Sequence, residues 1–170
     1  MTKANNVING VDLDELEGFR RRAREDPSCA DRNPVAVAEW KGSDRSLVRI
    51  RDKTIEVNTP GALSPMQLLL ASLTACDVDV AAQHAALLGV ELEALSVEAK
   101  GHFNVRSYIG LDGAPGSGYD AIDYTVRLRA RGATPEQIAR LREALEKSSP
   151  VGDSLTRSIP LRLELEVETA

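Results

Sequence analysis

The thiol of Cys76 is the most suggestive candidate for chemistry in the sequence, and it lies within the apolar stretch 64–89. A thiol attacks peroxides and disulfides as the thiolate. The local sequence does not favour that form, because Cys76 lies about three turns past the predicted helix start, where the helix dipole has faded. Asp79 shares its helix face and opposes ionisation. A reactive Cys76 therefore needs a cation from elsewhere in the fold or from another subunit; a buried, unreactive cysteine is the alternative.

Few other side chains offer chemistry. Cys29 is the second thiol and lies in the linker 27–34. It could resolve an oxidised Cys76 if this linker folded over the site, and an exposed loop residue is the alternative. His84 is expected to be buried and hydrogen-bonded, and His102 to lie on a strand surface. No CxxC or HxxxH spacing occurs, so we expect no metal and no cofactor.

The element that must position Cys76 is a helix with clear signals at both ends. Ser64, Pro65 and Gln67 form a capping box, and Gly89 suits the left-handed conformation that ends helices. The roughly 24 residues between them span about 36 Å. They are apolar almost all round, which is typical of a core helix. The second half is interrupted by polar residues, which disfavours a membrane span: Asp77, Asp79, Gln83 and His84.

Composition narrows the classes of function. The chain has 170 residues, of which 42% are hydrophobic and 28% charged, as in a soluble domain with a real core. Its net charge of −5 argues against a nucleic-acid partner. Residues 1–16 contain no apolar segment of the signal-peptide kind, and two cysteines do not suggest a disulfide scaffold. We therefore expect a cytoplasmic protein with no membrane or nucleic-acid partner.

Hydrophobic periodicity predicts an α+β fold with mainly antiparallel strands. Residues 1–10 are expected to be disordered or loosely attached. The predicted elements are a helix over 12–26, strands over 35–40, 47–51 and 54–57, the central helix, strands over 92–103 and 121–130, a helix from Thr134 to Ser149, and a closing strand over 159–167.

The run SPMQLLLASLTAC, continuing through DVDVAAQHAALLGVELEALSVEAKG, resembles the central helix of the OsmC/Ohr family, the osmotically inducible protein C and organic hydroperoxide resistance proteins. Ser149-Pro150-Val151 falls on the family's Cys-Pro-Val motif. The resemblance covers about residues 34–168. It implies an OsmC-like domain over 34–170 after an N-terminal extension over 1–33. The implied fold has antiparallel sheets wrapped around the long helix in an intertwined homodimer.

The resemblance also implies a thiol-dependent peroxidase. In the family one cysteine attacks a hydroperoxide and becomes a sulfenic acid, a second closes a disulfide, and a dithiol reductant reopens it. An arginine lowers the pKa of the thiolate, and a glutamate holds that arginine. Cys76 matches the attacking cysteine of this scheme.

The chain departs from the family pattern at two positions. Ser149 stands where the second cysteine should be, and Met66 occupies the glutamate position. Arg45 is the nearest equivalent of the arginine, with Arg49 and Arg51 equally near in sequence. The two-cysteine cycle therefore cannot run at the matched positions.

Two functions follow from these observations. The first is single-cysteine reduction of organic hydroperoxides in oxidative-stress defence. Cys76 attacks, Arg45 or a neighbour supplies positive charge, Ser149 lines the pocket and an external thiol resolves the sulfenate. The alternative is a non-catalytic protein that binds an apolar small molecule at the dimer cleft. A homodimer is expected in both cases, because a helix apolar on every side needs more cover than one meander gives.

Overall fold

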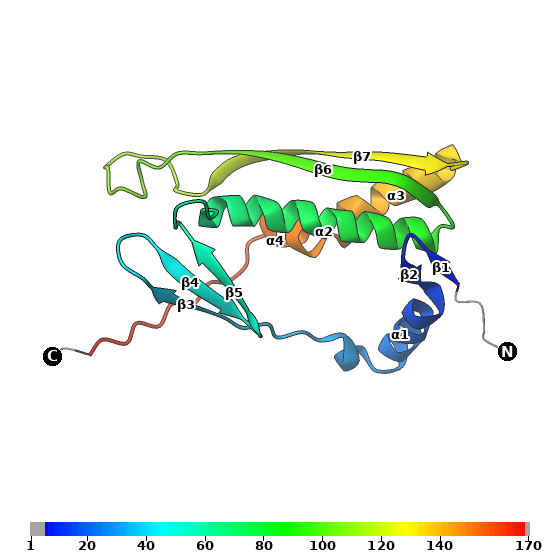
Figure 1. Ribbon diagram of the computed structural model, residues 1–170, viewed down its shortest axis with the longest axis horizontal. Coiled ribbons are helices and arrows are strands. Elements are labelled where there is room, and N and C mark those ends of the chain that lie inside the picture. Colours follow the sequence, from blue (N-terminus) through cyan, green and yellow to red (C-terminus); the bar gives the residue numbers. More distant parts are fainter. Residues whose placement is uncertain (1–5, 169–170) are drawn as a thin grey trace.

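Helix α2, Pro65–Leu87, is the axis of the fold in the computed structural model, which describes residues 6–168 (Figure 1). Its ends are those predicted. The Ser64 hydroxyl accepts a hydrogen bond from the Gln67 amide at 3.3 Å, and the Ser64 amide donates to Gln67 Oε1 at 2.9 Å. Gly89 follows with φ of 69°. By length and composition α2 could span a membrane; it packs against β6 and α3, and 22% of its most apolar window is buried.

One long hairpin lies along α2 for most of its length (Figure 1). Strands β6, Glu91–Phe103, and β7, Tyr119–Arg131, pair antiparallel with Leu95 opposite Leu128 and Val97 opposite Val126. Alternation sends these apolar side chains toward the helix. The outer face carries charged pairs such as Glu93 with Arg129 at 2.9 Å. The hairpin therefore covers one side of α2 and faces solvent on the other.

A smaller sheet lies on the opposite side of α2 from the hairpin (Figure 1). Strands β3, Ala36–Trp40, β4, Ser46–Ile50, and β5, Lys53–Val57, form the predicted antiparallel meander in the order β3-β4-β5. Of its apolar side chains only Val57 is buried, and Trp40 is 77% exposed. This sheet thus has an apolar surface that one copy of the chain leaves uncovered.

Two consecutive helices complete the packing around α2. Helix α3, Pro135–Ser148, begins with a capping box at Thr134 and buries Leu141 in a core with Val90 and Ala85. Helix α4, Pro150–Thr156, follows at once and is not among the predicted elements. Pro150 does end α3 as expected. It also begins the next helix, because proline is well suited to the first helical position.

The N-terminal segment is attached to α2 more firmly than expected. Strands β1, Val7–Ile8, and β2, Val11–Asp12, form a hairpin, followed by α1, Leu13–Glu25, and the short 3-10 helix η1, Pro27–Ala30. The expectation of loose attachment is wrong for residues 6–10, because the Asn9 side chain donates to Val90 O at 2.9 Å and accepts from the Leu92 amide at 2.8 Å. Residues 1–5 lie outside the described part.

Helix α1 forms as predicted, with Asp12 as its cap. The division into an extension over 1–33 and a domain over 34–170 stays a prediction.

The closing strand predicted over 159–167 does not form. Residues 158–168 are extended but pair with no strand in the described part of the chain. Leu161 is 94% and Leu163 92% exposed. The segment does alternate apolar and charged residues, but a strand also needs a partner edge, and residues 6–168 of one copy supply none.

Candidate active site

Cys76 and Ser149 meet where α2 passes the junction of α3 and α4. The Cys76 Sγ lies 3.6 Å from the Ser149 Oγ, within hydrogen-bond distance for sulfur. Ser149 is only 5% exposed, and its hydroxyl also accepts a bond from the Gly152 amide at 3.1 Å as the cap of α4. The cap fixes the Ser149 side chain, so its hydroxyl is held beside the half-buried thiol.

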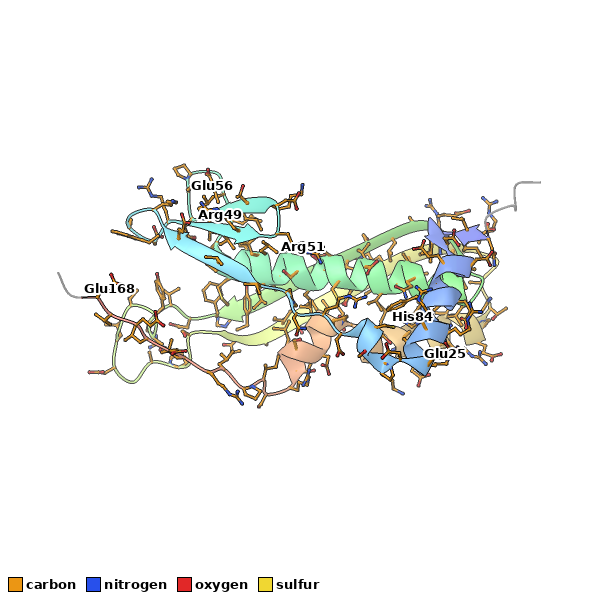
Figure 2. All side chains as sticks on the ribbon, turned by 90° about the horizontal axis from the view of Figure 1, so that it is seen from below. Glu25, Arg49, Arg51, Glu56, His84 and Glu168 are labelled. Atoms are coloured by element: carbon orange, nitrogen blue, oxygen red, sulfur yellow. The ribbon has the colours of Figure 1, made fainter. Side chains whose placement is uncertain are left out.

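None of the three candidate arginines forms a hydrogen bond with Cys76 within residues 6–168. The Arg45 guanidinium lies at the β3–β4 turn and donates to Gly42 O at 3.4 Å. Arg49 is paired with Glu39 across the small sheet. Arg51 lies at the turn between β4 and β5. It overlaps α2 in the view of Figure 2, but Figure 1 shows that this end of the small sheet lies away from the helix. Within residues 6–168 of one copy, Cys76 thus contacts Ser149 but receives no hydrogen bond from these arginines.

Met66, at the family's glutamate position, contacts the hairpin through its backbone. Its carbonyl oxygen accepts a hydrogen bond of 2.7 Å from the Tyr119 hydroxyl. The Tyr119 ring packs edge-on against Phe103, with centroids 5.3 Å apart, and lies directly over Gly101. These contacts fasten the start of α2 to the hairpin.

A cavity of about 530 Å³ adjoins the site between α2, β7 and α4. Leu69, Leu73 and Met66 line it from the helix, and Ile122 and Tyr124 from the strand. Ser149 is part of its wall, whereas Cys76 is not. The serine hydroxyl therefore stands between the thiol and an apolar space large enough for a small organic molecule.

Asp77, expected from the sequence only to interrupt the apolar run of α2, is a buried group. It is fully buried, and neither carboxylate oxygen has a hydrogen-bond partner in the described part of the chain. Burial raises the pKa of the Tyr124 hydroxyl, and the charges of Asp77 and Glu146 raise it further. Helical spacing gave one hint, because Asp77 shares a face with Leu73 and Val80.

The remaining candidate residues lie apart from the thiol. Cys29 is in η1 beside α1 and, like Cys76, is not in a disulfide. His84 is part-buried where α1 crosses α2 (Figure 2), and burial, with the charge of Arg20, lowers its pKa. His102 is exposed on β6 and pairs with Asp120 at 2.8 Å.

Fold and site together define an α+β protein in which a hairpin and two short helices surround a long helix that carries one thiol. The sequence model of the family described as OsmC-like protein matches residues 58–164. The chain belongs to this family, as the resemblance implied. No curated protein matches the sequence.

Solved structures agree on the fold. An OsmC-like protein from Mycoplasma pneumoniae superposes with a TM-score of 0.62 at 16% identity, covering 74% of this chain and 89% of the other. A Legionella pneumophila protein described as an organic hydroperoxide resistance protein OsmC gives 0.54 at 18% identity, covering 74% and 90%. An OsmC-like protein of unknown function from Vibrio cholerae gives 0.55 at 12%, covering 73% and 94%. At such identities the likeness shows the fold alone.

Proposed function

We propose that this protein reduces organic hydroperoxides through Cys76 alone, as part of oxidative-stress defence in the cytoplasm. The observation that carries the proposal is the 3.6 Å approach of the Cys76 Sγ to the Ser149 Oγ beside an apolar cavity. Family membership and neighbours described as hydroperoxide resistance proteins support it.

The proposed reaction runs in three steps. The Cys76 thiolate attacks the terminal peroxide oxygen, and the O–O bond breaks. The sulfur becomes a sulfenic acid, while the departing alkoxide takes a proton and leaves as the alcohol. An external thiol condenses with the sulfenic acid, releasing water and forming a mixed disulfide. A second external thiol then attacks that mixed disulfide, which restores the Cys76 thiol and releases the two external thiols joined as a disulfide.

Ser149 has a limited part in this cycle. Its hydroxyl donates a hydrogen bond to the peroxide or to the departing oxygen, but it cannot form a disulfide. The sulfenic acid is therefore resolved by a thiol from outside the matched positions, and the rate of turnover depends on the concentration of that thiol.

The working unit in this proposal is a homodimer. The C-terminal residues Leu161 and Leu163 and the outer side chains of β3, such as Trp40, are exposed apolar groups that a second copy would cover. The dimer would also bring an arginine, Arg45 or its neighbours Arg49 and Arg51, to the thiolate. Sedimentation as a monomer at micromolar concentration would contradict this part of the proposal.

A second candidate is a protein that binds an apolar small molecule without catalysis. The observation that favours it is the cavity itself, which is lined by Ser149 but not by Cys76. Native mass spectrometry of protein purified without added ligand tests this candidate, which predicts a co-purified molecule.

Stopped-flow consumption of cumene hydroperoxide, with excess dithiothreitol, decides between the two. The peroxidase proposal predicts fast consumption by the wild type and by Cys29→Ser, and none above background by Cys76→Ser. Equal, slow consumption by all three proteins would refute it and leave the binding function.

A further inference from the structure

We infer that Ser149 stabilises the Cys76 thiolate: its hydroxyl, fixed by the Gly152 amide, donates its one hydrogen to the Cys76 sulfur. Ser149 thereby takes over part of what the arginine does in the family scheme. The inference deepens the proposed function, on which it rests for the use of the thiolate. It holds whether or not a second copy supplies an arginine.

The direction of the hydrogen bond between Cys76 and Ser149 follows from the groups available. A serine hydroxyl has one hydrogen to donate and two lone pairs to accept with. The Ser149 Oγ accepts the Gly152 N–H at 3.1 Å, and the Cys76 Sγ lies 3.6 Å from it. A neutral thiol could donate to the Oγ, but a thiolate has no hydrogen, so only Ser149 can donate once Cys76 ionises. The bond therefore favours the ionised form.

Burial strengthens this hydrogen bond. Ser149 is 5% exposed, so little water competes for its hydroxyl. The Ser149 Oγ has no second acceptor within hydrogen-bond distance among residues 6–168. A hydrogen bond to a charged group stabilises more than one between neutral groups. The sulfur is thus the one atom in this part of the chain to which the hydroxyl can donate.

The backbone around Ser149 holds the hydroxyl in place before Cys76 ionises. Ser149 is the cap of α4, and its carbonyl oxygen accepts the Asp153 amide at 2.8 Å. Residue 152 leaves room for the hydroxyl because it is a glycine: a Cβ there would lie 3.0 Å from the Ser149 Oγ. The donor therefore needs no rearrangement when the negative charge forms.

The charged groups of the surrounding elements do not replace this donor. On α2 the nearest in the chain are Asp77 and Asp79, whose negative charges would oppose a thiolate. The hairpin carries its charged pairs on the outer face, and Tyr124 on β7 and Glu146 on α3 bring no positive charge. The cations of the last turn of α3 and the end of α4 are each paired with a carboxylate at 2.6 to 3.0 Å: Arg142, Lys147 and Arg157.

The pH dependence of Cys76 alkylation tests the inference on the full chain. Cys29→Ser is the parent protein, so that Cys76 is its only thiol, and iodoacetamide is the probe because the thiolate is the form that reacts. Ser149→Ala should slow the reaction about tenfold at neutral pH and move the midpoint of the profile to higher pH, as expected for the loss of one hydrogen bond to a charged group. Well above the midpoint the two proteins should react at similar rates, whereas a change of access would alter the rate at every pH.

Further variants separate the hydroxyl from the cap. Ser149→Thr has both a hydroxyl and a cap and should restore a profile close to that of the parent. Ser149→Gly keeps a good cap without a hydroxyl and should match Ser149→Ala, so it decides if the alanine variant does not fold. Asp153→Ala is the control for weakening of α4, because it breaks the pair with Arg157 and leaves the Ser149 side chain intact. Its profile should equal that of the parent.

An unchanged midpoint in Ser149→Ala and Ser149→Gly would overturn the inference. The same shift in Asp153→Ala would also overturn it, as would failure of Ser149→Thr to restore the profile. The proposed function fails separately, because alkylation uses no peroxide. A midpoint that depends on Ser149, without Cys76-dependent consumption of peroxide, would refute the peroxidase and leave the stabilised thiolate in place.

Discussion

The Cys76 Sγ and the Ser149 Oγ lie 3.6 Å apart, although 73 residues separate them in the chain. Helix α2 supplies the thiol and the cap of α4 supplies the hydroxyl, so each side chain is fixed by its own element. The side chains of residues 76 and 149 thus approach each other as a pair of cysteines would, although residue 149 is a serine.

Ser149→Cys should restore a disulfide with Cys76. The two side chains already touch, and a sulfur in place of the Oγ needs only a small approach to reach bonding distance. Mild oxidation should remove two free thiols from the variant within one chain, measured by thiol titration and by intact mass. Ser148→Cys, at the exposed neighbouring position, is the control and should keep its thiols. Failure of Ser149→Cys to close the bond would show that the approach is not maintained in solution.

Gly101→Ala should destabilise the protein and loosen the start of α2. A Cβ on Gly101 would lie 2.6 Å from the Tyr119 Cδ1, so the ring must move and its hydrogen bond to the Met66 carbonyl lengthen. Crowding of this kind costs about 1–3 kcal/mol of unfolding free energy. Urea denaturation measures the loss, and Gly116→Ala, which meets no atom within 4 Å, should be near neutral. Equal stability of both variants would contradict the close packing.

Asn9→Gly should release the N-terminal hairpin from α2. The Asn9 backbone has φ of 54°, which glycine accepts, so the change removes side-chain bonds to Val90 and Leu92 without adding strain. Amide exchange in residues 7–25 should accelerate, and the unfolding free energy fall by about 1–3 kcal/mol. The control is Asn58→Gly, at φ of 58° directly after β5, which should leave exchange in residues 7–25 unchanged. Unaltered exchange in Asn9→Gly would show that other contacts hold the segment.

The pKa of the Glu39 carboxyl shows whether Arg49 is paired with Glu39 or with another group. Hydrogen bonds from Arg49 and Lys41 lower the pKa of its carboxyl from 4.5 to about 2. The folded pKa is depressed, so the pair stabilises the fold above pH 4.5 and the contribution is lost as pH falls toward 2. Carboxyl NMR should show a pKa near 2 in the wild type and a rise toward 4.5 in Arg49→Gln, with a smaller rise in Lys41→Gln. A pKa near 4.5 for Glu39 in the wild type would mean that Arg49 is not paired with it. Arg49 would have to break this pair in order to approach the Cys76 thiolate.

Local sequence signals predicted most of the fold, since caps depend on neighbouring residues. Ser64, Thr134 and Asp12 begin their helices as expected, and Gly89 ends α2. The strands β3 to β7 were also predicted, with ends displaced by a residue or two, whereas the short β1–β2 hairpin was not. Pro150 marks the limit of such reasoning, because the same residue ends one helix and begins the next.

Features that depend on distant partners could not be predicted from the residues. The alternation over 159–167 indicates a strand, yet no edge among the residues that the structure describes pairs with it. The approach of Ser149 to Cys76 was expected from the family motif and not from spacing. The burial of Asp77 without a hydrogen-bond partner in residues 6–168 depends on how other elements pack against α2, which helical periodicity alone does not specify.

Trapping of a sulfenic acid tests the central claim most directly. Reduced protein is treated with one equivalent of cumene hydroperoxide in the presence of dimedone, and the adduct is located by peptide mass spectrometry. The account predicts an adduct on Cys76, little on Cys29, and none in Cys76→Ser. Absence of the adduct from Cys76, or equal labelling of Cys29, would contradict it.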